Sequence, residues 1–136
     1  MKKEITVSAT IENVEQVTNF INCELDSINC PTKAKSEIDI AIDELFSNIA
    51  KYAYNPEIGK ATVQIEITDN PPSVILVFMD DGKPFNPLDK IEPKIDGSLE
   101  EREIGGLGIF MVKKSMDNVE YEYKNNKNIL KIKKNI

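Results

Sequence analysis

The chain has 136 residues, a length typical of one domain, and its 40% hydrophobic and 29% charged residues are proportions of a globular protein and not of a disordered one. Its 17 lysines and arginines against 23 aspartates and glutamates give a formal net charge of -6, which argues against direct binding to nucleic acid. The sequence has no histidine, which excludes catalysis through a histidine, histidine-ligated zinc and phosphotransfer through a histidine of this chain.

The first half of the chain predicts one strand and two helices. Residues 5–10 alternate apolar and polar side chains, which is typical of a strand with one covered face. Apolar residues spaced by three and four predict an amphipathic helix over residues 11–29, which ends before Pro31. Thr32 is a candidate N-cap of a second helix that runs to about Tyr54. Cys23 and Cys30 are interpreted as free thiols that pack as small hydrophobic groups.

The second half predicts a mainly β structure interrupted by one helix. Residues 62–68 and 74–79 predict a hairpin, and residues 80–104 predict a long loop, of which 81–104 is a candidate lid. A short helix follows from Gly105 to about residue 117, and residues 119–123 and 129–132 predict two last strands. This order predicts one α+β domain over residues 1–136, a two-layer sandwich with helices on one face of a mixed, mainly antiparallel sheet.

Two absences bear on the location of the protein. No apolar run approaches the roughly 18 residues of a membrane span, and the N-terminus lacks the apolar stretch of a signal peptide. We therefore expect a cytoplasmic protein that does not contact a membrane.

Three polar side chains of the second predicted helix share one edge of it. Glu44, Asn48 and Lys51 are spaced by four and three residues, so they lie within about 60° of each other beside the apolar stripe. Such a trio can supply a base, an oxygen ligand for Mg²⁺ and a cation for phosphate. Taken alone, the spacing is more typical of a solvated helix face with a weak ion pair.

Two further clusters contain glycine. In Asp80-Asp81-Gly82, a carboxylate at the end of an apolar strand can accept a hydrogen bond from an exocyclic amine such as N6 of adenine, although this tripeptide is also a common turn. Three of the six glycines fall within residues 105–108, just before a predicted helix. Uncovered amides at a helix N-terminus can bind phosphate, and the alternative is a flexible loop that enters a helix.

The order of the three clusters resembles the N, G1 and G2 boxes of the GHKL ATPases, the Bergerat-fold superfamily. Within it, the chain is similar over nearly its whole length to the single-domain bacterial anti-sigma factor serine kinases, which implies the fold of a histidine kinase-like ATPase domain. The residues that carry the resemblance are Glu44, Asn48, Lys51 and Tyr52, then Asp80, Gly82, Phe85 and Pro87, then Gly105, Gly106, Leu107 and Gly108.

The resemblance implies ATP and Mg²⁺ as ligands and a role for each matching residue. It implies that Asn48 binds Mg²⁺, that Glu44 acts as general base, and that Lys51 contacts phosphate. Asp80 would bind the adenine amine, and Gly82 would allow the close approach of the base.

The same resemblance assigns the phosphates to the glycine segment. The backbone amides of Gly105, Gly106, Leu107 and Gly108 would bind phosphate. Arg102, the sole arginine, is a candidate contact of the γ-phosphate, and a solvated charge fits it at least as well. Pro84 stands where many relatives have a second glycine, which restricts the backbone after Gly82.

The implied activity is that of a protein kinase that also regulates transcription. It would transfer the γ-phosphate of ATP to a serine of a STAS-type anti-sigma factor antagonist and would sequester a sigma factor, commonly as a homodimer. The first alternative is a nucleotide-dependent protein-binding switch without significant kinase activity, which would not depend on Glu44. A regulatory ATPase and a scaffold with an unused site are the remaining alternatives. Because a phosphoaccepting histidine is missing, a complete sensor histidine kinase is excluded.

Overall fold

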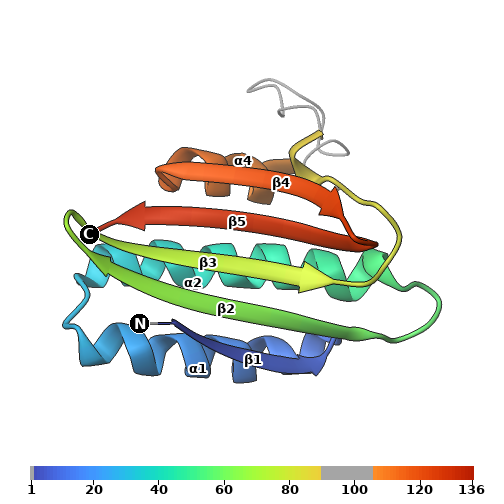
Figure 1. Ribbon diagram of the computed structural model, residues 1–136, viewed down its shortest axis with the longest axis horizontal. Coiled ribbons are helices and arrows are strands. Elements are labelled where there is room, and N and C mark those ends of the chain that lie inside the picture. Colours follow the sequence, from blue (N-terminus) through green and yellow to red (C-terminus); the bar gives the residue numbers. More distant parts are fainter. Residues whose placement is uncertain (1, 90–105) are drawn as a thin grey trace.

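The computed structural model describes residues 2–89 and 106–136. Within them, three α-helices pack on one face of a five-stranded sheet (Figure 1). The elements in chain order are β1 (Lys2–Ser8), α1 (Val14–Ser27), α2 (Thr32–Asn48), β2 (Lys60–Asp69), β3 (Pro72–Asp80), α4 (Gly106–Ser115), β4 (Asn118–Lys124) and β5 (Lys127–Asn135).

The sheet has the strand order β1-β2-β3-β5-β4, and every neighbouring pair is antiparallel. The predicted α+β fold with helices on one face of a mainly antiparallel sheet is therefore confirmed. The central strand β3 ends at Asp80, which stands opposite Ala61 of β2 and Asn128 of β5. The C-terminal end of the central strand is thus flanked on both sides.

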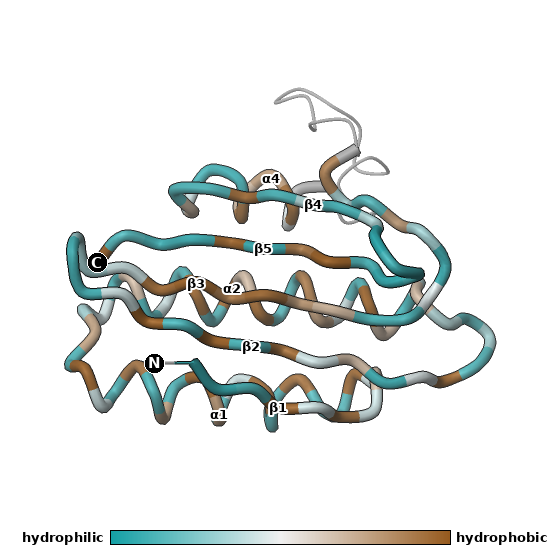
Figure 2. Tube along the Cα trace, in the orientation of Figure 1, coloured by the Kyte–Doolittle hydropathy of each residue, from teal (hydrophilic) through white to brown (hydrophobic). Residues whose placement is uncertain are grey.

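The hydrophobic core lies between the sheet and the helices, with α2 between α1 and α4 (Figure 1). Hydrophobic residues are concentrated on the middle strands β2, β3 and β5, whereas β4 is mostly hydrophilic (Figure 2). Each large apolar side chain that is fully buried contributes about 1.5–3 kcal/mol to stability. The largest of these are Phe46, Phe78, Ile21, Leu25, Ile38, Ile42, Leu45, Ile65, Leu76, Ile132, Val17 and Val63.

Both ends of the long helix α2 differ from the prediction. Thr32 is its first residue and makes no capping hydrogen bond, because the N-cap position is taken by Pro31. The α-helix ends at Asn48, and a π-helical turn, Ile49–Ala53, follows it. Asn48 therefore lies where the helical hydrogen-bonding pattern changes, and π-helical turns are frequent at functional sites.

The first helix also begins later than predicted. A 3₁₀ turn, Ile11–Asn13, precedes α1, and Asn13 Nδ2 donates to the carbonyl oxygen of Ser8 at 2.7 Å. Both cysteines are free, but Cys23 is exposed and only Cys30 packs against the core. The expectation that both thiols pack as hydrophobic groups is therefore wrong for Cys23.

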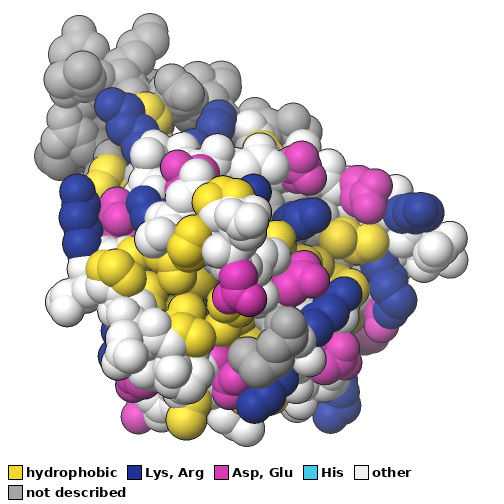
Figure 3. Space-filling view, turned by 60° about the vertical axis from the view of Figure 1, so that its left-hand side comes forward, with side chains coloured by type: hydrophobic (Ala, Val, Ile, Leu, Met, Phe, Trp, Pro, Cys, Tyr) yellow, Lys and Arg dark blue, Asp and Glu magenta, His cyan; other side chains and the backbone are white. Residues whose placement is uncertain are grey.

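The loop after β3 is described only as far as residue 89, where Pro87–Asp89 forms a 3₁₀ turn. Residues 90–104 of the predicted lid lie outside the described part of the chain. Among residues 2–89 and 106–136, no helix is long and apolar enough to cross a bilayer. On the face seen in Figure 3, acidic, basic and apolar side chains are interspersed.

Candidate functional site

A small cavity lies between the C-terminal end of α2, the sheet end at Asp80 and the loop that follows β3. Its volume is about 30 Å³. That is room for about one or two water molecules, whereas pockets for drug-sized ligands have roughly 300–1,000 Å³. The cavity is therefore smaller than a nucleotide base. The cavity is lined by Leu45, Asn48, Ile49, Ala53, Phe78, Asp80, Phe85, Pro87, Tyr121, Asn128 and Leu130.

Asp80 supplies a buried carboxylate to this cavity and is 6% exposed. Its Oδ1 accepts hydrogen bonds from the Gly82 N–H at 2.8 Å and from Asn128 Nδ2 at 2.9 Å. Within the described residues these are its only hydrogen bonds, so Oδ2 is left as an acceptor. Burial raises the pKa of Asp80 above its ordinary value, and the two hydrogen bonds oppose that shift. The carboxylate can therefore bind a hydrogen-bond donor such as an exocyclic amine.

Asn128 is the residue of this site that the sequence did not reveal. It is 5% exposed and belongs to a run of asparagine and lysine that predicts only a turn. The one available signal is the period of two that places Asn128, Leu130 and Ile132 on the same buried face of β5. The side-chain amide of Asn128 joins several segments.

Its Oδ1 accepts hydrogen bonds from the Phe85 N–H at 3.0 Å and from the Tyr121 hydroxyl. Its Nδ2 donates to Asp80, to the Lys83 carbonyl at 2.9 Å and to the Gly82 carbonyl at 3.4 Å.

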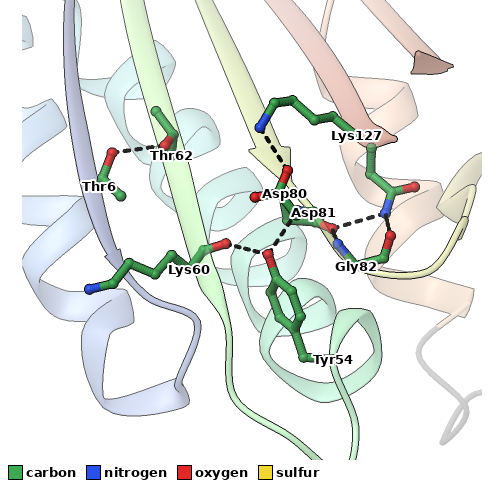
Figure 4. Close-up of polar contacts among 9 residues, drawn as sticks. Thr6, Tyr54, Lys60, Thr62, Asp80, Asp81, Gly82 and Lys127 are labelled. Carbon is green, nitrogen blue, oxygen red and sulfur yellow. Dashed lines mark hydrogen bonds and ion pairs between the residues drawn. The ribbon is translucent and has the colours of Figure 1, made fainter. Parts of the chain in front are cut away.

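Tyr54 connects the start of β2 to the end of β3 (Figure 4). Its hydroxyl donates to the Lys60 carbonyl oxygen at 2.6 Å and accepts from the Asp81 N–H at 2.7 Å. The exposed Asp81 carboxylate pairs with Lys127 Nζ at 2.7 Å (Figure 4). An exposed ion pair of this kind contributes at most about 1 kcal/mol to stability. The two hydrogen bonds of the Tyr54 hydroxyl therefore hold the end of β3 to the start of β2 more strongly than the ion pair does.

Gly82 lies against the end of the π-helical turn, and no side chain fits there. A Cβ atom on Gly82 would lie 2.3 Å from the carbonyl oxygen of Ala53, which itself accepts a hydrogen bond from the Lys83 N–H at 3.1 Å. Glycine at this position therefore allows the loop to approach the helix closely enough for the Asp80 hydrogen bond to form.

Asn48 brings a second polar side chain into the cavity wall. It is 7% exposed, and its Nδ2 is buried without a hydrogen-bond partner in the described part of the chain. An unpaired buried polar atom costs about 1–3 kcal/mol, and a ligand or its hydration water can satisfy it. The side-chain oxygen of asparagine suits Mg²⁺, which commonly keeps several waters and phosphate oxygens as its other ligands. The described residues contain no cluster of three or more acidic, cysteine or histidine side chains.

Glu44 lies against a different neighbour, the first turn of α4. A Cβ atom on Gly108 would lie 2.1 Å from Cδ of Glu44 and 2.2 Å from its Oε2. The two residues are therefore in contact although 64 positions separate them. Glu44 does not line the cavity with Asn48 and Asp80.

The other predicted site residues have less defined surroundings. Lys51 is exposed in the π-helical turn and does not line the cavity. Gly106 and Leu107 are the first two residues of α4, ahead of Gly108. Arg102 and Gly105 lie outside the described residues. The structure thus brings Asn48 and Asp80 together at the cavity, with Gly82 hydrogen-bonded to Asp80, and it brings Glu44 into contact with Gly108.

Comparisons with known proteins give a family, a relative in sequence and a similar solved structure. Residues 7–134 match the family described as histidine kinase-like ATPase domain. An anti-sigma F factor of Caldanaerobacter subterraneus subsp. tengcongensis is 31% identical over 88 residues, which cover 64% of this chain and 59% of that protein. A crystal structure of the RsbU and RsbW domains of Rv1364c from Mycobacterium tuberculosis matches with a TM-score of 0.72.

The two matches differ in coverage and in sequence identity. The Mycobacterium tuberculosis match covers 99% of this chain and 32% of the other, at 15% identity, so it concerns the fold alone. The matched region spans less than two thirds of either relative.

Proposed function

The chain belongs to the histidine kinase-like ATPase domain family, and we propose that it is an ATP-binding anti-sigma regulatory factor with serine kinase activity. The observation that carries this proposal is the buried Asp80, whose Oδ1 is held by two donors while Oδ2 remains an acceptor beside the cavity. An acceptor in an apolar wall favours a base with an exocyclic amine at that position, as adenine has. The similarity to an anti-sigma F factor supports the regulatory role.

Each site residue has a proposed role in this reaction. Asp80 binds the adenine amine, and Asn48 is the protein ligand of Mg²⁺, which would neutralise phosphate charge when bound. Lys51 contacts phosphate. The backbone N–H groups of Gly106 to Gly108 at the start of α4 bind phosphate, because a helix N-terminus attracts anions. We assign the same function to Gly105 and a γ-phosphate contact to Arg102.

Glu44 is the proposed general base. It would accept the hydroxyl proton of a serine on the partner protein while the γ-phosphoryl group is transferred in line to that oxygen. The proposed acceptor is a STAS-type anti-sigma factor antagonist, and the proposed sequestered partner is a sigma factor. We further propose that the chain is a single domain, acts as a homodimer and is cytoplasmic.

One observation favours a nucleotide-dependent switch without kinase activity as a second candidate. Glu44 packs against Gly108 and does not line the cavity, so nucleotide could bind without engaging it. Phosphotransfer by the wild type and by E44Q distinguishes the two candidates. A kinase transfers phosphate as wild type and loses this transfer in E44Q while it keeps nucleotide binding. A switch transfers no significant phosphate, and E44Q keeps its nucleotide binding and its partner binding.

Thermal unfolding with ADP and ATP, each with and without Mg²⁺, tests the nucleotide site. Ligand at a hundred times its Kd stabilises by about 2.7 kcal/mol, which raises Tm by roughly 10 °C for a domain of this size. D80N places a donor where the base amine requires an acceptor, so this shift should disappear. D81N is the matched control, because the Asp81 side chain is 64% exposed and pairs with Lys127 outside the cavity. A chain that shows no shift with any nucleotide would refute both candidates.

A further inference from the structure

Asn128 is a buried polar residue to which the proposed function assigns no role. It stands directly opposite Asp80 in the register of β3 and β5, and it lies outside the three clusters that resemble the superfamily motifs. A buried asparagine with five hydrogen bonds constrains every group that it contacts.

The partners of Asn128 determine which way its amide points. The Phe85 N–H can only donate, so the atom that faces it is the amide oxygen. The Lys83 carbonyl can only accept, so the atom that faces it is the amide nitrogen. The same nitrogen then faces Asp80, which receives a donor at Oδ1 whatever ligand is bound.

This orientation ties Asp80 to the loop that follows it. The amide holds the backbone at Lys83 and Phe85 against the start of β5. The Phe85 ring also stacks on Tyr52 of the π-helical turn, with ring centroids 5.2 Å apart. The loop that carries Phe85 is therefore held on one side by β5 and on the other by the end of the helical segment.

We propose that Asn128 is a positioning residue: its amide holds Asp80 with Oδ2 available to the ligand and holds the loop at residues 82–85 against β5. The inference rests on the proposed function, because it takes an adenine nucleotide as the ligand of Asp80. Without the amide, the buried carboxylate keeps one hydrogen bond, to Gly82, and residues 82–85 lose the hydrogen bonds that Asn128 makes to them.

Calorimetric titration of the full chain with MgADP tests the effect on affinity. N128A is expected to bind roughly 10-fold or more weakly than the wild type, since it removes a hydrogen bond to a buried charge. N118A is the matched control, because the Asn118 amide is exposed and, among the residues that the structure describes, donates only to Glu120. N128A with an affinity within twofold of wild type would overturn the proposal.

N128D separates positioning from a general loss of packing. At pH 8 the new carboxylate faces Asp80 and binding weakens, because two like charges meet in a buried site. As the pH falls to 6 the two carboxyl groups share a proton, and the new hydroxyl can donate to Asp80 as the amide did. The affinity of N128D should therefore rise about 10-fold from pH 8 to pH 6, while that of the wild type does not rise. The neighbouring charges of Asp81 and Lys127 and the hydroxyl groups of Tyr54 and Tyr121 are the same in both proteins. Parallel pH profiles would overturn the proposal.

Amide hydrogen exchange makes the test independent of nucleotide. In the ligand-free chain, N128A should speed exchange of the Phe85 N–H by 10-fold or more. Unchanged exchange would contradict the proposal that the Asn128 amide holds the loop at residues 82–85 against β5. A wild type that binds no MgADP refutes the proposed function, and the exchange rates then decide the role of Asn128 alone. Should circular dichroism show N128A unfolded, the two pH values of N128D decide it.

Discussion

Gly108 has no side chain, and the carboxyl group of Glu44 occupies the space where its Cβ atom would lie. G108A therefore sets two effects against each other. Alanine is favoured over glycine in a helix by up to about 1 kcal/mol, so α4 itself should gain stability. The new methyl group, however, must displace the carboxyl of Glu44 from 2.1 Å to at least the 3.4 Å of ordinary contact, a movement of about 1.3 Å.

This displacement is inexpensive for the fold but large for catalysis. The atoms that must move belong to the far end of a flexible side chain, so the helices α2 and α4 can keep their packing. A general base moved by about 1 Å loses roughly 10²-fold in rate. We expect G108A to keep or raise the wild-type Tm, to bind MgADP with nearly wild-type affinity, and to transfer phosphate roughly 100-fold more slowly.

The assay is single-turnover transfer from γ-labelled ATP to a STAS-domain protein, with Tm and MgADP affinity measured on the same preparation. G82A is the control, since its methyl group would meet the backbone oxygen of Ala53 at 2.3 Å, which cannot rotate away. It should unfold more easily, by about 1–3 kcal/mol. Wild-type transfer by a stable G108A would refute the reasoning that Gly108 exists to make room for Glu44.

Two predictions concern stability alone. Y54F removes the hydroxyl that joins Lys60 to Asp81 and should lower the free energy of unfolding by about 1–3 kcal/mol in urea titration; an unchanged midpoint would contradict the role of this hydroxyl. Burial raises the pKa of Asp39 in the folded state, so its charge destabilises the fold above that pKa, and the cost is lost as the pH falls toward the unfolded value of about 3.9. D39N should therefore raise Tm at pH 7 and leave it unchanged near pH 3. An equal gain at both pH values would show that the charge is not responsible.

Local patterns were sufficient to predict the order of the main elements and the packing of helices on one face of the sheet, but they did not predict the strand order β1-β2-β3-β5-β4. Alternation of apolar and polar residues along β2 indicates that one face of the sheet is buried, and the apolar stripe of α2 indicates the helix face that covers it. The boundaries of α2 were less predictable, because the π-helical turn continues the spacing of the α-helix at a slightly different pitch.

The contacts of the candidate site depend on pairs that are distant in the sequence. Asn128 and Asp80 are 48 positions apart, and their contact follows from the register of β5 on β3. Neither residue type signals the pairing, since asparagine in a turn and aspartate after a strand are both common. The resemblance placed Glu44 and Gly108 in one site, but only the packing of α4 on α2 shows that they touch.

The position of β5 in the sheet has a consequence for the timing of folding during synthesis. β3 lies at the middle of the sheet, yet one of its two neighbours, β5 (Lys127–Asn135), is synthesised only after α4 and β4. Until those residues leave the ribosome, the strand Pro72–Asp80, with its run of Val, Ile, Leu, Val, Phe and Met, has an unpaired edge.

Such an edge is a template for pairing with other nascent chains. A ribosome stalled before residue 127 would therefore release a product that carries all the motif residues but lacks β5, which pairs with β3 and β4 in the complete sheet. The same product would lack the amide opposite Asp80, so assembly of the cavity and protection from aggregation are completed by the same late segment.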